Sequence, residues 1–162
     1  MLQSFQFLAS MLDNEHRGIR STAVETLVSI TKARLENNQI TASDKAGFLN
    51  KVHEVVSGFL KRFAEDAKSL FRRKADMLIL MAKLILHLSS RELKMDVITL
   101  LVKMWRDPDS EVRIVSIKMM LTLAEAKTAE VLECFGQQSL NAKRTACSVV
   151  SVGRPTNMAH LR

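Results

Sequence analysis

Few residues in this sequence could carry catalysis or bind a metal, and they lie far apart. The chain has four histidines and two cysteines in 162 residues. No two histidines have the spacing of a zinc site, in which paired ligands stand a few residues apart. The glycines stand alone, so no glycine-rich phosphate loop is present. We therefore predict no metal, no cofactor and no catalytic residues. The histidines are His16, His53, His87 and His160.

Two local patterns resemble parts of active sites without the residues that would complete them. Ser29 and Lys32 match a Ser-x-x-Lys pattern of nucleophile and base, but they fall inside a predicted helix and no companion motif occurs. Cys134 stands next to Glu133, whose negative charge does not favour a thiolate. We interpret both as chance matches. The sequence thus predicts a protein that is not an enzyme and has no small-molecule substrate.

A cluster of positive charge is the strongest chemical signal in the chain. The net charge is +7, and six basic residues fall within fourteen positions, opposed only by Glu65 and Asp66. This basic cluster is either a solvated helix edge or a patch that binds an acidic protein surface or phosphates. Tyrosine is absent, and base stacking for single-strand recognition needs aromatic side chains. The cluster consists of Lys61, Arg62, Lys68, Arg72, Arg73 and Lys74.

Helical periodicity runs along almost the whole chain, and no segment shows the alternation of a strand. For example, Ile19, Ala23, Leu27 and Ile30 recur at spacings of three and four. The pattern predicts helices at about 2–12, 15–35, 44–64, 69–88, 91–105 and 109–126, followed by a short helical start at 128–135. The fold class is therefore predicted to be all-α.

Polar residues that favour helix starts divide these segments. Thr41 and Asp44 form a capping-box pattern, as do Ser89 and Glu92. Asp107 precedes Pro108, which suits a capping acid before a proline at the first helical position. These residues predict the starts of three of the helices.

One motif occurs three times, each time at the turn between two predicted helices. It consists of an Asx residue, an arginine six positions later that follows an apolar residue, and a small residue three positions further on. Successive copies are 52 and 41 residues apart. The copies are Asn14 with Ile19, Arg20 and Ala23; Asp66 with Phe71, Arg72 and Ala75; and Asp107 with Val112, Arg113 and Ser116.

The repeated motif resembles the HEAT repeat of the armadillo-like superfamily over about residues 1–135. This resemblance implies a right-handed α-solenoid of about three antiparallel helix pairs plus a partial fourth. It also implies that each Asx side chain caps its own turn and meets an arginine from a neighbouring repeat. The resulting ladder contains Asn14, Asp66, Asp107, Arg20, Arg72 and Arg113. The first contact is expected to be weaker because Asn14 replaces the usual acid. Loss of the Asp107 side chain is expected to cost about 1–2 kcal/mol through the lost cap.

The predicted organisation is a helical repeat domain at 1–135 and a largely disordered C-terminal tail at 136–162. Because the array stops within a repeat, we expect the chain to be a fragment or splice form of a longer array. No apolar stretch is long enough to cross a membrane, and the N-terminus does not read as a secretory signal. We expect an intracellular protein without membrane contact; the pattern does not distinguish cytoplasm from nucleus.

These observations favour a non-enzymatic scaffold that binds another protein, whose identity a fold does not supply. Helix register places Lys74 and Lys118 in rows that mix apolar and charged residues, as a protein-binding groove does. One alternative is a nucleic-acid-binding or chromatin-associated HEAT subunit that uses Lys61, Arg62, Lys68, Arg73 and Lys74. A third hypothesis is a tubulin-binding HEAT domain that uses the turns at 16–18, 67–70 and 108–110.

Overall fold

The structure, a computed structural model, describes residues 2–65 and 73–126. Within these ranges helices alternate with short connections and no strand occurs, so the predicted all-α fold class is confirmed. The helices are α1 (Leu2–Ser10), which continues as the 3-10 turn η1 (Met11–Asp13), α2 (Arg17–Glu36), α3 (Ala42–Glu65), α4 (Lys74–Ile85), α5 (Arg91–Met104) and α6 (Ser110–Glu125). The predicted helical start at 128–135 and the predicted tail at 136–162 lie outside the described residues.

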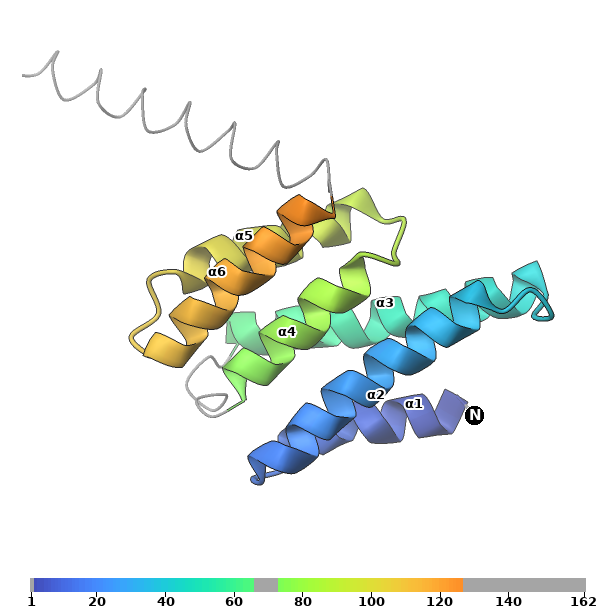
Figure 1. Cartoon of the computed structure of the whole chain (residues 1–162), viewed down its shortest axis with the longest axis horizontal. Helices are drawn as coiled ribbons and strands as arrows, with labels where there is room; N and C mark the ends of the chain where they lie inside the picture. Colours follow the sequence, from blue (N-terminus) through green and yellow to red (C-terminus); the bar gives the residue numbers. More distant parts are fainter. Residues whose placement is uncertain (1, 66–72, 127–162) are drawn as a thin grey trace, which may run out of the picture.

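The helices form two layers (Figure 1). In the front layer α2 contacts α4, and α4 contacts α6; behind it α1 contacts α3, and α3 contacts α5. Each front helix also packs on the back helix that precedes it in the chain. In the part of the chain that the structure covers, no helix is long and apolar enough to cross a membrane.

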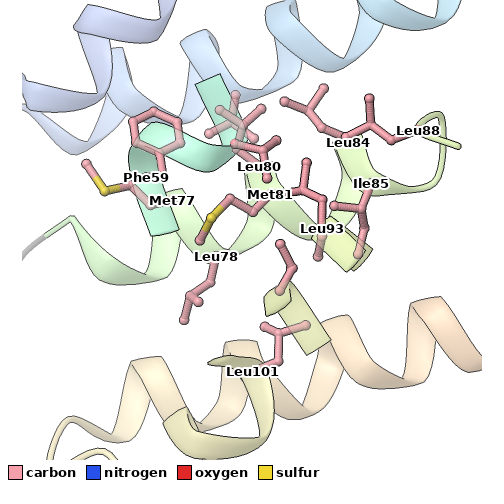
Figure 2. Close-up of a cluster of buried hydrophobic side chains, with 14 of the residues drawn as sticks. Phe59, Met77, Leu78, Leu80, Met81, Leu84, Ile85, Leu88, Leu93 and Leu101 are labelled. Atoms are coloured by element: carbon pink, nitrogen blue, oxygen red, sulfur yellow. The ribbon is translucent and has the colours of Figure 1, made fainter. Parts of the chain in front are cut away.

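Helix α4 lies at the centre of the core (Figure 2). It is apolar on almost every side because α2, α3, α5 and α6 all pack against it. Phe59 from α3 and Leu101 from α5 extend the same cluster. The α4 side chains that are completely buried are Met77, Leu78, Leu80, Met81, Leu84 and Ile85.

The helix starts follow the sequence pattern with two shifts. The hydroxyl of Thr41 accepts a hydrogen bond from the backbone N–H of Asp44 at 3.1 Å and donates to its carboxylate at 2.7 Å. The capping prediction for Ser89 was wrong, because Ser90 caps α5 by accepting from the N–H of Leu93 at 3.3 Å. Adjacent serines can both cap, and the backbone geometry at the turn selects one of them.

The start of α6 also differs from the prediction. The N-cap is Asp109, whose carboxylate accepts from the N–H of Glu111 at 2.8 Å. Pro108 therefore precedes the helix. The carboxylate of Asp107 accepts instead from the N–H of Asp109 at 3.0 Å. Asp107 thus fixes the turn before the helix and leaves the cap itself to Asp109.

His87 lies half-buried in the connection between α4 and α5. Burial lowers the pKa of His87 below 6.5, nearby Glu36 acts in the opposite direction, and Lys32 adds to the lowering. The folded protein therefore favours the neutral imidazole, and the unfolded chain binds the proton more readily.

The stability that neutral His87 contributes is present above pH 6.5 and is lost as the pH falls through the lower folded pKa. A His87→Gln variant removes this part of the pH dependence. Between about pH 7.5 and about pH 5.5 the Tm of the variant should fall less than that of the unchanged chain. Thermal melts followed by circular dichroism measure both. Parallel falls in Tm would show that His87 does not contribute.

Candidate functional site

The turns that carry the first and third copies of the motif are built with the same contacts. The side-chain oxygen of Asn14 accepts from the N–H of His16 at 2.9 Å. The carboxylate of Asp107 accepts from the N–H of Asp109, again two positions ahead, at 3.0 Å. The Asx residue of each copy therefore orders its own turn. Asp66, the Asx residue of the second copy, lies outside the described residues.

The motif arginines also occupy equivalent places. Nη1 of Arg20 donates to the carbonyl oxygens of Asn14 at 3.0 Å and Glu15 at 2.8 Å. Nη1 of Arg113 donates to the carbonyl oxygens of Asp107 at 2.8 Å and Pro108 at 2.9 Å. Each arginine thus holds the backbone of the turn in front of its own helix. Arg72, the arginine of the second copy, is not among the described residues.

Two buried ion pairs join consecutive helices of the front layer. Arg20 on α2 meets Asp76 on α4 at 2.6 Å, and their side chains are 6% and 12% exposed. Lys74 on α4 meets Asp107, in the turn before α6, at 2.8 Å, and their side chains are 10% and 4% exposed. The expected binding role of Lys74 is therefore corrected, because its ammonium group is enclosed and paired. Helix register placed Lys74 on the surface, but α4 is covered on nearly every side.

Sequence reasoning missed Asp76, which stands in the first turn of the most apolar helix. Acidic residues are almost never buried unless they are paired. An aspartate within a run of Met, Leu and Ile is therefore a signal for a buried cation nearby. The signal does not name the cation, because Arg20 lies 56 residues away in the sequence.

The basic cluster is largely neutralised by carboxylates. Asp13 in η1 contacts both Arg62, at 2.6 Å, and Arg73, at 3.3 Å. Lys61 lies 3.6 Å from Glu65 on the surface of α3. Every cluster member that the structure describes thus has a carboxylate partner, whereas Lys68 lies in the undescribed stretch 66–72. Exposed pairs of this kind contribute little stability, but they lower the positive potential that a phosphate backbone requires.

A groove of about 410 Å³ crosses the front layer between α4 and α6. Its apolar lining consists of Ile79, Ile114, Val115 and Met119. Lys118 also lines the groove, and among the described lysines and arginines predicted for the basic cluster or the mixed rows it alone does so. Arg17 and Glu111 form an ion pair between the first turns of α2 and α6 beside it. The groove therefore combines an apolar floor with charged margins.

Helix α6 also exposes apolar side chains on the side away from α4. Ile117 and Leu121 are 48% and 59% exposed, and Ile114, at the border with the groove, is 53% exposed. These residues recur at helical spacing along one stripe of α6. We call Ile117 and Leu121 the outer face of α6. Contiguous exposed apolar surface of this kind marks interaction sites more often than ordinary protein surface does.

No cluster of potential metal ligands occurs among residues 2–65 and 73–126. No group of three or more His, Cys, Asp or Glu side chains is placed to hold a metal ion there. Cys134 and His160 lie outside these ranges. Comparison of the chain with models of protein families, with curated proteins and with solved structures found no match.

The pairing of Lys74 with Asp107 predicts a larger effect than loss of a cap alone. Asp107→Ala leaves the Lys74 ammonium buried without its carboxylate, so unfolding free energy should fall by about 3–5 kcal/mol. Asp109→Ala, a matched control that removes only an N-cap, should cost about 1 kcal/mol. Urea denaturation measures both.

The double variant Lys74→Met with Asp107→Leu removes both charges and should recover much of that loss. If Asp107→Ala costs no more than Asp109→Ala, Asp107 acts as a turn residue alone and the pair does not stabilise the layer.

Proposed function

We propose that the chain is a non-enzymatic helical-repeat scaffold of the HEAT type that binds another protein on its front layer. The equivalent contacts of Asn14 with Arg20 and of Asp107 with Arg113 support this repeat assignment, because they recur 93 residues apart at the same place in a helix pair. In this proposal α1–α2, α3–α4 and α5–α6 are successive units of a right-handed solenoid.

The observation that carries the binding function is the groove between α4 and α6. Ile79, Val115 and Met119 give it an apolar floor, and Lys118 stands at its margin. An apolar centre with a polar rim is the usual composition of a protein–protein interface. Stacked helices present such a surface rigidly. The scaffold therefore loses little conformational entropy when a partner helix or loop binds.

The charges of the basic cluster favour a protein partner over nucleic acid. Binding to a phosphate backbone depends on several basic side chains that exchange counterions for phosphates. Arg62 and Arg73 share Asp13, and Lys61 faces Glu65. A phosphate would have to displace these carboxylates. Lys118 alone in the groove supplies too little charge for such a mode.

Photo-crosslinking tests this proposal directly. A photo-reactive amino acid in place of Lys118, in the groove, should give a discrete protein adduct in cells that survives nuclease treatment. The matched control carries the same amino acid in place of Lys61, which is equally exposed but lies in the basic cluster; it should give no adduct of that size. The proposal fails if position 118 gives no adduct, or if the adducts concentrate at position 61 and disappear with nuclease.

A further inference from the structure

Helices α2 and α6 can be compared position by position, because the motif aligns them with an offset of 93 residues. Val24 and Thr31 of α2 are 5% and 0% exposed. Their counterparts in α6 are Ile117 and Ala124, and both of these are exposed. Val28 of α2 is partly buried against the core, whereas its counterpart Leu121 is 59% exposed. On α2 the next front-layer helix, α4, packs against the helix, whereas no described helix follows α6. The outer face of α6 therefore has the composition of a packing face, and none of the described helices packs on it.

Arg113 of α6 is the counterpart of Arg20 of α2, and the contacts of the two guanidinium groups can be compared in the same way. Arg20 donates Nη1 to two turn carbonyls and Nε to the carboxylate of Asp76 on α4, at 2.6 Å. Arg113 donates Nη1 to the two equivalent carbonyls. Within the described part of the chain, no carboxylate lies at ion-pair distance from Arg113. The guanidinium of Arg113 thus makes the same two turn contacts as that of Arg20, and no described carboxylate occupies the position that Asp76 has beside Arg20.

We infer that the outer face of α6 binds an amphipathic helix of another protein, with a carboxylate of that helix on Arg113 and its aliphatic side chains over Ile117 and Leu121. The partner helix would repeat the relation that α4 has to α2, in which Asp76 meets Arg20 while neighbouring apolar residues cover the helix. Charge complementarity with Arg113 selects an acidic helix over a basic one. Binding of an apolar helix face to such a stripe is a recurring mode of recognition.

This inference rests on the proposed scaffold function but uses a different surface from the groove. Leu121 lies on the side of α6 that faces away from α4, whereas the groove is lined by Val115, Lys118 and Met119. Crosslinking at position 118 therefore tests the proposed function, and peptide binding at the outer face tests the present inference. If adducts persist at position 118 while the outer face binds nothing, only the present inference fails.

The test uses the full chain and a synthetic helical peptide of about fifteen residues with leucines at helical spacing and one aspartate at the start of the leucine face. Fluorescence anisotropy of the labelled peptide should show saturable binding. An otherwise identical peptide with asparagine for the aspartate should bind about tenfold more weakly, since its neutral amide oxygen replaces the charged acceptor for Arg113. Leu121→Glu should abolish binding. Phe7→Ser, which removes an equally exposed apolar side chain on α1, should leave it unchanged.

An Arg113→Gln variant, tested with both peptides, completes a double-mutant cycle between Arg113 and the peptide aspartate. If Arg113 receives the carboxylate, this variant should bind the aspartate and asparagine peptides with equal affinity. Three results overturn the inference. The first is absence of saturable binding, and the second is equal affinity of both peptides for the unchanged chain. The third is a lower Tm or a shift from dimer to monomer in free Leu121→Glu, which would show that residues 127–162 or a second copy already cover the face.

Discussion

Two buried ion pairs fix the front layer, and both depend on α4. Lys74 and Asp76 stand two positions apart on this helix, and successive residues of an α-helix turn by about 100°, so the two side chains leave α4 on opposite sides. Asp76 reaches Arg20 of α2, and Lys74 reaches Asp107 before α6. A buried charge is costly unless it is paired. The apolar packing of α4 already favours one register, and the two pairs add a requirement that specific charges meet.

The same pairing determines which surfaces remain for binding. Lys74 is used inside the protein, and Asp13 holds Arg62 and Arg73. The described members of the basic cluster are therefore engaged in ion pairs within the fold. Helix α6, in contrast, leaves apolar side chains exposed in the groove toward α4 and on the outer face. Binding is accordingly proposed on α6, where Arg113 has the turn contacts of Arg20 and no described carboxylate at ion-pair distance.

The sequence predicts the helices well because their periodicity is local. The observed α2 and α5 begin and end within two residues of the predicted ranges, and the turn motif marks 14–20 and 107–113, which share their contacts. The sequence did not predict which of two neighbouring polar residues caps a helix. Ser90 rather than Ser89, and Asp109 rather than Asp107, cap their helices, since backbone geometry selects between neighbours. The partners Arg20 and Asp76 depend on how α2 packs on α4, and no local pattern contains that packing. Helix register likewise placed Lys74 on the surface because it does not show which helices cover α4.

The central claim is that an ion pair between helices fixes the register of the front layer. A double-mutant cycle on Arg20 and Asp76 tests it most directly, with Arg20→Met, Asp76→Leu and the combined variant compared by urea denaturation. Arg20→Met takes the guanidinium away from the buried Asp76 carboxylate and should cost about 3–5 kcal/mol, and Asp76→Leu removes the same contact from the other side. We expect the double variant to cost less than the sum of the two single losses, by a coupling of about 1.5–3 kcal/mol. Additive losses would contradict it, because they would show that Arg20 and Asp76 stabilise the fold independently.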